Sequence, residues 1–569
     1  MSERPDMVIR GGTVADGSGG PLRQADVAVS GGRITAVGAV RASGREEIDA
    51  RGRLVTPGFV DVHTHYDAQA TWANQILPSS CNGVTTVLMG NCGVGFAPVR
   101  PEHHDMLIAL MEGVEDIPEV VMQEGLPWTW ANFPDYLDFL AGRRFDVDVA
   151  TQVPHAALRV FVMGERGANR EEATAEDRAE MARLAAEGVR TGAFGFSTSR
   201  LLQHRTAAGE TVPSYGAAEA ELAEIADAVA QVGRGWIQVV GDYGEAIDSE
   251  FGLLQRLAKR SGRPVTFTLL QTHRYPEQWR DLLARTAAAN AAGAEIIGQI
   301  RGRPTSTLLG FELSENPFLG CESWGAVASL PMPERVAALR DPALRARLIA
   351  EPGGSRRQVR RLQDWENLYP LGDPPQYEPD PCTSIGAVAR RQGIAPAELA
   401  YDLMLEGDGR GILYHPMTNY AGGDMAPVYE MLGHPNTLIG LGDGGAHVGI
   451  MCDATDMLHT LTHWTRDRSR GPKRGLAEMV RRLTAANADA MGLRDRGRIL
   501  PGLRADINVL DYDALALRGP EVRYDLPAGG KRILQGSRGI DATLVAGVPV
   551  WRLGEATGAL PGRLVRSGG

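Results

Sequence analysis

Two histidines lie two residues apart directly after an apolar run, in the segment TPGFVDVHTHYD that begins at Thr56. Side chains alternate across a strand, so Asp61, His63 and His65 would share one face. At this spacing, two imidazole nitrogens can converge on one cation, at about 2.0–2.1 Å if the cation is zinc. The alternative is two ordinary polar residues on one side of a strand. We expect a metal site if neighbouring elements bring further ligands to this pair.

The middle of the chain alternates between strand-like and helix-like segments. The strand-like runs are GVTTVLMG, GAFGFSTS, GWIQVV, RPVTFTLL and NTLIGLGDGG, and the helix-like runs include AEDRAEMARLAAEGVR and AEAELAEIADAVAQVG. This alternation is typical of a parallel α/β architecture. The length of 569 residues leaves room for a large barrel with accessory domains. We therefore predict a (β/α)8 barrel of the TIM type, with His63 and His65 at the carboxyl ends of its strands, where the active sites of such barrels form.

Both ends of the chain predict short antiparallel strands with glycine turns. The segments are MVIRGGTVADGSGG and ADVAVSGGRITAVGAV near the start, and GLRADINVLDYDAL and GIDATLVAGVPVWRL near the end. We predict that residues 1–56 and 496–569 together form a small β-sandwich and that residues 57–495 form the barrel. Residues about 304–380 are rich in proline, arginine and tryptophan. They predict an insertion over the barrel mouth, either a lid or a plain surface excursion.

Composition excludes several classes of partner. The formal net charge is -11 and the pI is near 5.7, which is unlike the basic surface of a nucleic-acid-binding protein. We find no signal-peptide-like start and no run long enough to cross a bilayer, so we expect a cytoplasmic protein without a membrane partner. Five cysteines in this length do not suggest a disulfide framework. A homo-oligomer is compatible with all of these observations.

The segment RGRLVTPGFVDVHTHYD resembles the amidohydrolase superfamily, and residues 83–101, GVTTVLMGNCGVGFAPVRP, resemble the second strand and loop of its N-acyl-D-amino-acid deacylases. Further similar segments are GAFGFSTS, GLGDGGAHVG and NADAMGLRDRGRILPGLRADINVLDYDAL. The resemblance implies metal-dependent hydrolysis of the amide C–N bond of a small N-acyl compound, without a covalent enzyme intermediate. Two alternatives remain: hydrolysis of a cyclic amide or carbamate on the same scaffold, and a non-catalytic relative that binds a small molecule.

The resemblance also implies a set of site residues. Cys92 matches the family's bridging cysteine, and Asp443 matches the aspartate that ligates the metal and acts as general base. The chain has only three lysines, so a carboxylated lysine has no obvious source. The alternatives are a small buried thiol for Cys92 and a plain Asp-Gly-Gly turn for Asp443. His447, four residues after Asp443, and His155 are candidate substrate-binding residues at the barrel mouth.

The sequence departs from the deacylase pattern at three positions. Val239 and Leu269 occupy the places of two further histidine ligands, and Gln271 replaces a basic residue that helps to hold the substrate carboxylate. We therefore expect about one tightly bound divalent ion per chain, zinc in view of the nitrogen and sulfur donors, with a second site weak or absent. Candidate replacement ligands or substrate contacts are His204, Asp242 and His273, and candidate partners of a substrate carboxylate are Arg301 and Arg303.

Overall fold

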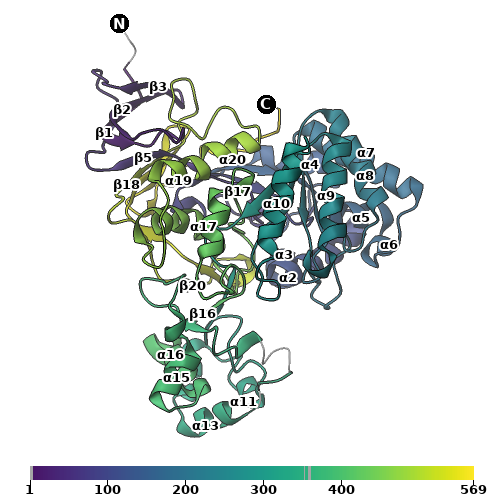
Figure 1. The fold of residues 1–569 in the computed structure, drawn as a ribbon, viewed down its shortest axis with the longest axis vertical. Helices are drawn as coiled ribbons and strands as arrows, with labels where there is room; N and C mark the ends of the chain where they lie inside the picture. Colours follow the sequence, from purple (N-terminus) through teal and green to yellow (C-terminus); the bar gives the residue numbers. More distant parts are fainter. Residues whose placement is uncertain (1–3, 352, 356–360, 569) are drawn as a thin grey trace.

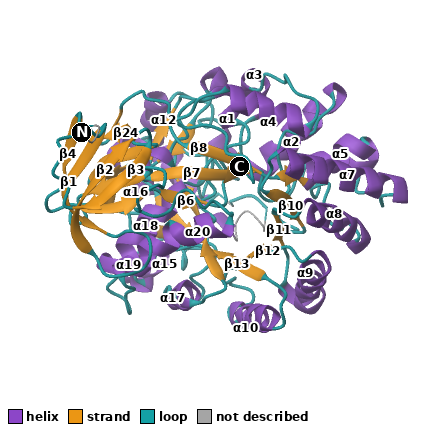
Figure 2. Ribbon diagram, turned by 90° about the horizontal axis from the view of Figure 1, so that it is seen from above, coloured by secondary structure: helices purple, strands orange, loops and turns teal. Residues whose placement is uncertain are grey.

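The computed structural model describes residues 4–351, 353–355 and 361–568, and its centre is a barrel of parallel strands surrounded by helices (Figures 1 and 2). This confirms the predicted TIM-type barrel, and each strand-like run named above contains one of its strands. The barrel strands in chain order are β6 (Phe59–Asp61), β7 (Val84–Met89), β8 (Asp148–Thr151), β10 (Gly195–Ser199), β11 (Trp236–Val240), β12 (Val265–Thr268), β13 (Ile296–Ile300) and β17 (Thr437–Ile439).

Hydrogen bonding runs around the barrel in two parallel arcs. One arc has the order β6-β7-β8, and the other runs from β17 through β13, β12, β11 and β10 to the short strand β9 (Val153–Pro154). Only Gln152 separates β8 from β9, so the two arcs meet there. At the opposite seam, Thr64 forms a parallel bridge with Gly444. The barrel therefore closes through the segments that follow β6 and β17.

The helices that follow the barrel strands cover its outer face. They include α7 (Ala175–Thr191), α8 (Glu219–Val232), α9 (Ile247–Ser261) and α10 (Gln278–Ala291). A capping box begins α7: the Thr174 side chain accepts a hydrogen bond from the Asp177 N–H, and the Asp177 carboxylate accepts one from the Thr174 N–H. Among the described residues, no helix combines the length and the apolar character needed to span a bilayer. The cytoplasmic location and the homo-oligomer stay predictions.

The two ends of the chain meet in one sheet, as expected for the small β-sandwich. Its strands follow the order β25-β24-β23-β18-β5-β1-β2-β3, and β4 pairs with β1. In Figure 1 these strands lie beside the barrel at the upper left. The N-terminal strands are β1 (Met7–Val14), β2 (Arg23–Ser30), β3 (Arg33–Gly38), β4 (Glu46–Asp49) and β5 (Leu54–Pro57); the C-terminal strands are β18 (Ile507–Leu510), β23 (Ile540–Val545), β24 (Val548–Arg552) and β25 (Glu555–Ala556).

A helical lobe projects from the barrel between β13 and β17, at the bottom of Figure 1. Two antiparallel strands form its base, β14 (Ser306–Leu309) and β16 (Leu413–Pro416). Its own hydrophobic core extends from Leu309 to Leu413, so it reaches beyond the predicted insertion of about 304–380. The composition of the sequence indicated only the irregular part of this lobe, because the sequences of its last two helices are similar to those of ordinary barrel helices. The lobe helices are α11 (Glu322–Gly325), α12 (Met332–Leu339), α13 (Pro342–Ala350), α15 (Ile385–Gln392) and α16 (Pro396–Gly409).

Candidate metal centre

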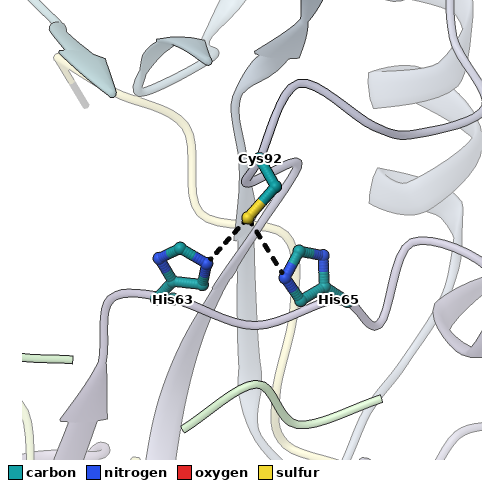
Figure 3. Close-up of side chains that lie close together, drawn as sticks. All are labelled: His63, His65 and Cys92. Carbon is teal, nitrogen blue, oxygen red and sulfur yellow. Dashed lines mark hydrogen bonds between the residues drawn. The ribbon is translucent and has the colours of Figure 1, made fainter. Parts of the chain in front are cut away.

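Three potential metal ligands converge where β6 and β7 end. The Nε2 atom of His63 lies 3.2 Å from the Sγ atom of Cys92, and the Nε2 atom of His65 lies 3.7 Å from the same sulfur. Figure 3 shows the two rings on opposite sides of this sulfur. All three side chains are buried. Within the described part of the chain, they are the group of His, Cys, Asp and Glu side chains whose ligand atoms lie close enough to share one ion.

The separations of these donors fit a small divalent cation. Bond lengths of about 2.0–2.1 Å to nitrogen and 2.3 Å to sulfur place tetrahedral donors about 3.3 Å apart for two nitrogens and about 3.6 Å apart for nitrogen and sulfur. The observed nitrogen–sulfur distances of 3.2 and 3.7 Å bracket the latter value. Burial lowers the pKa of His63 to about 4 and that of His65 well below its usual value. Both imidazoles are therefore neutral at pH 7, as metal ligands must be.

Glycines on both sides of Cys92 shape the loop that presents its sulfur. Cys92 has a positive φ of 55°, and its N–H donates to the side-chain oxygen of Gln238 at 2.9 Å. A Cβ atom at Gly90 would lie 2.4 Å from the Gln152 carbonyl oxygen, so only glycine fits at that position. The Asn-Cys-Gly motif is thus tied to this backbone path, which turns the thiol toward the two histidines.

Asp443 completes the arrangement from the eighth barrel strand. Its Oδ1 atom lies 3.5 Å from His63 Nε2 and 3.8 Å from His65 Nε2. Its Oδ2 atom accepts a hydrogen bond from Arg301 Nη1 at 3.3 Å. Burial raises the pKa of Asp443 to about 6, whereas the charges of Arg301 and His447 act to lower it. One carboxylate oxygen therefore faces the imidazoles while a guanidinium group holds the other.

A glutamine fixes the orientation of the His63 ring. The Nδ1 atom of His63 lies 2.6 Å from Gln299 Oε1, and the same amide donates from Nε2 to Thr266 Oγ1 at 3.1 Å. Because the amide uses its donor on Thr266, its oxygen must accept the proton of His63 Nδ1. This leaves the lone pair of His63 Nε2 directed at the sulfur. The contact fixes the tautomer that ligation requires.

Glu115 is a functional candidate that the sequence analysis missed. This residue ends α2 (His104–Glu115) and is buried. Its Oε1 atom lies 3.1 Å from His65 Nδ1, and its Oε2 atom lies 3.9 Å from His447 Nε2. It also accepts the backbone N–H of His447 at its own carbonyl oxygen. No sequence pattern singled it out, because a glutamate at the end of a helix is normally exposed.

The positions expected to carry two further histidines are apolar and buried. Val239 lies in β11 and Leu269 directly follows β12, and both are at most 1% exposed. Among the described residues, no other ligand takes the place of the two histidines: His204, Asp242 and His273 do not join the cluster of His63, His65 and Cys92. His273 is exposed. The hypothesis that one of these residues substitutes for the missing ligands is therefore not supported by the geometry.

A cavity of about 1100 Å³ opens at the carboxyl ends of three consecutive barrel strands, β10 to β12. His204 and His447 line it. The Nδ1 atom of His204 lies 2.8 Å from Ser199 Oγ, so its Nε2 atom remains available for a ligand. Burial lowers the pKa of both histidines. These two neutral imidazoles are therefore placed where a substrate would contact them.

Two other predicted substrate-binding residues lie elsewhere. His155 is buried, and its ring nitrogens lie 2.8 Å from Thr198 Oγ1 and 2.7 Å from Glu221 Oε1. Both nitrogens are thus occupied within the protein, which corrects its placement at the mouth. Arg303 is also buried: its guanidinium donates to the Cys452 carbonyl oxygen at 2.7 Å and lies 4.0 Å from the centre of the Tyr377 ring. It does not line the cavity.

Comparison with known proteins gives consistent similarities. Residues 46–551 match the amidohydrolase family. The chain is 29% identical to an N-acyl-D-aspartate deacylase of Alcaligenes xylosoxydans xylosoxydans, over 99% of this chain and 95% of that protein. It resembles the crystal structure of a D-aminoacylase with a TM-score of 0.66 and 25% identity, over 99% of this chain and 100% of the other. It shares its fold with an N-acyl-D-glutamate deacylase from Bordetella bronchiseptica, complexed with zinc and a phosphonate inhibitor, at a TM-score of 0.64 and 24% identity, over 99% and 100% of the two chains.

Proposed function

The chain belongs to the amidohydrolase family and is a metal-dependent hydrolase, and from this premise we propose that it removes the acyl group from N-acyl-D-amino acids. The observation that carries the proposal is the convergence of His63, His65, Cys92 and Asp443 on one buried point beside a cavity. Four side chains from three separate segments of the sequence would not be expected to meet there without a shared ligand. A non-catalytic relative would not need all four.

The proposed centre holds one tightly bound zinc ion. His63 and His65 would supply nitrogen donors, Cys92 a sulfur donor and Asp443 Oδ1 an oxygen donor, a mixture that suits zinc. A second ion is disfavoured because Val239 and Leu269 have no ligand atoms. A divalent cation bound at this point polarises a carbonyl group and lowers the pKa of water.

The chain's own residues supply proton transfer and orientation. We assign the proton transfer to Asp443 Oδ2, which takes a proton from the attacking water and returns it to the nitrogen of the leaving amine. Arg301 fixes the direction of this carboxylate, and Gln299 fixes the direction of the His63 ring. Asp443 must be ionised to act as a base, and the adjacent guanidinium group favours that form. His204 and His447 would contact the substrate at the cavity wall.

A substrate panel tests the proposal. Zinc-loaded protein is incubated with N-acetyl derivatives of neutral D- and L-amino acids, a hydantoin and an N-carbamoyl compound. The products are separated and quantified: the free amino acid from the N-acetyl and N-carbamoyl compounds, and the ring-opened N-carbamoyl acid from the hydantoin. The His63→Asn variant is the control for contaminating hydrolases. We expect turnover of N-acetyl-D-amino acids that the variant lacks. Preferential opening of the cyclic amide or cleavage of the carbamoyl compound would instead assign the alternative reaction on the same scaffold. Absence of turnover with every compound would overturn the proposed activity.

A further inference from the structure

The wall of the large cavity carries more acidic than basic side chains. Of the residues that the structure describes, five carboxylates and three guanidinium groups line it. This balance is unexpected beside a site whose proposed substrates are anions, because relatives that remove acyl groups from D-aspartate and D-glutamate act on substrates with two carboxylates. The acidic residues are Glu112, Asp116, Asp242, Glu245 and Glu250, and the basic ones are Arg200, Arg274 and Arg361.

All three arginines of the wall already have carboxylate partners. Arg200 donates to both oxygens of Glu250, at 2.8 and 2.9 Å. Arg274 lies 3.0 Å from a carboxylate oxygen of Glu245. Arg361 also donates to both oxygens of a carboxylate, that of Glu315. A substrate carboxylate would have to compete with an existing ion pair at each of these positions. The wall thus offers no guanidinium group whose charge is unbalanced, within the described part of the chain.

The position that carries a basic residue in the deacylase pattern is neutral and committed to the protein. Gln271 is buried; its Nε2 atom donates to the Pro276 carbonyl oxygen at 3.1 Å, and its Oε1 atom accepts the Ala421 N–H at 3.1 Å. The buried guanidinium groups of Arg301 and Arg303 are held by Asp443 and Asp453. Among the described residues, no side chain available at this cavity therefore replaces the missing positive charge.

Asp242, in contrast to these arginines, is a charged residue of the cavity wall whose side chain has no partner among the described residues. It follows β11 by two residues, is half-buried and lines the cavity. Among the described residues, no hydrogen bond or ion pair engages its carboxylate. It lies three residues beyond Val239, where the deacylase pattern has a metal-binding histidine. The strand end that has lost a metal ligand therefore presents an unbalanced negative charge to the cavity.

We propose that the cavity selects N-acyl amino acids with a cationic side chain and that Asp242 pairs with this cation. The inference rests on the proposed function and names its substrate class. The excess of carboxylates repels a second acidic group, whereas a guanidinium or ammonium group gains a charge-assisted hydrogen bond. N-acyl-D-arginine-type compounds are thus the favoured substrates, and N-acyl-D-glutamate-type compounds are the disfavoured ones.

Two measurements on the full-length, zinc-loaded protein test this selection. The kcat/KM values for N-acetyl-D-arginine, N-acetyl-D-leucine and N-acetyl-D-glutamate are compared, and calorimetry measures the affinity for the arginine and glutamate compounds in the Asp443→Asn variant, which should keep the metal and lose most of the turnover. We expect the arginine compound to exceed the glutamate compound by about tenfold in both measurements, which corresponds to one charge-assisted hydrogen bond.

Variants of Asp242 locate the source of the preference. Asp242→Asn is expected to reduce the arginine-to-glutamate ratio by about tenfold, and Asp242→Glu is expected to retain most of it. Asp105→Asn is the control, because this exposed aspartate of α2 does not line the cavity. A glutamate compound that binds as tightly as the arginine compound would overturn the inference. If N-acetyl-D-leucine is still hydrolysed, the proposed function stands even though the selection is refuted. If none of the three compounds is hydrolysed, the proposed function is refuted, whatever the binding measurement shows.

Discussion

The backbone N–H of Asp443 donates to the carbonyl oxygen of His63 at 3.0 Å. The next contact along the seam is the His65 N–H, which donates to the Gly444 carbonyl oxygen at 2.7 Å. These hydrogen bonds join the segments that follow the first and the eighth barrel strands. The proposed general base and the proposed metal ligands are therefore fixed by the same contacts that close the barrel. Their relative positions depend on the backbone and not on flexible loops.

Replacing Asp443 by asparagine should preserve metal binding and abolish most of the turnover. The amide keeps the shape and one ligand oxygen but cannot accept a proton at neutral pH. We expect kcat to fall by about 10²- to 10⁴-fold, the usual contribution of a general base. Metal content and the circular dichroism spectrum should match those of the wild type. Near-normal turnover in the variant would assign the base to another residue.

The substitution His63→Asn should remove metal and activity together, because it deletes one of the two imidazole ligands of the proposed centre. Elemental analysis of the purified variant gives the metal content. The matched control is His273→Asn, since His273 is an exposed histidine near the barrel mouth outside the cluster. Unchanged metal in His63→Asn would contradict the proposed centre, and metal loss in His273→Asn would show that the ligand set is larger.

Protein purified without added metal should contain about one equivalent of tightly held divalent ion, with zinc as the dominant element. Val239 and Leu269 deprive a second position of two ligands, whereas structural and catalytic zinc sites gather three or four. Dialysis against a weak chelator followed by mass spectrometry of the metals provides the count. Two equivalents that survive this treatment would refute the single-ion proposal.

Glu115→Gln should weaken metal binding, because it removes the carboxylate that lies 3.1 Å from His65 Nδ1 while keeping the size of the side chain. Loss of such an outer partner usually lowers metal affinity by about 10- to 100-fold. Competition with a chromogenic chelator measures the affinity. Glu112→Gln changes a half-buried glutamate of the same helix and should leave the affinity unchanged. Equal affinities in both variants and the wild type would exclude a role for Glu115.

A buried ion pair next to the barrel should make stability depend on pH. Burial by itself would raise the pKa of Glu378, but hydrogen bonds from His463, Arg468 and the Met425 N–H lower it to about 2. Because the folded-state pKa lies below the ordinary value of 4.5, this stabilisation is complete above pH 4.5 and is lost as the pH falls toward 2.

The variant Glu378→Gln should therefore be less stable at pH 7, by roughly 3 kcal/mol for an interrupted buried pair, and should lose less stability on acidification. Melting temperatures of the two proteins between pH 7 and pH 2.5 measure the difference. Parallel pH profiles would show that Glu378 does not cause the acid sensitivity. The exposed pair of Glu366 and Arg390 offers a control, since Glu366→Gln should change the melting temperature little.

The sequence by itself determined most of the repeating elements and the choice of the central candidate residues. Apolar periodicity and glycine turns are local properties, and they were sufficient for most strands of the barrel and of the terminal sheet, although β8, β13, β4 and β25 were not indicated. The period-two spacing of His63 and His65 places both on one face before any long-range contact forms. Cys92 and Asp443 became candidates through the resemblance of their segments to the deacylase family.

Only the tertiary structure decided which side chains surround that site. His63 meets Gln299 across 236 residues of sequence, and Glu115 reaches His65 from the end of a helix, so no local pattern could indicate either contact. The same holds for Arg303 and His155. The sequence suggested that both could contact a substrate, but their polar atoms form hydrogen bonds with buried groups of the protein. A side chain's chemistry is set by its residue type. Its burial, its hydrogen-bond partners and the polar atoms that it leaves free for a ligand are set by barrel closure, which brings distant strand ends together.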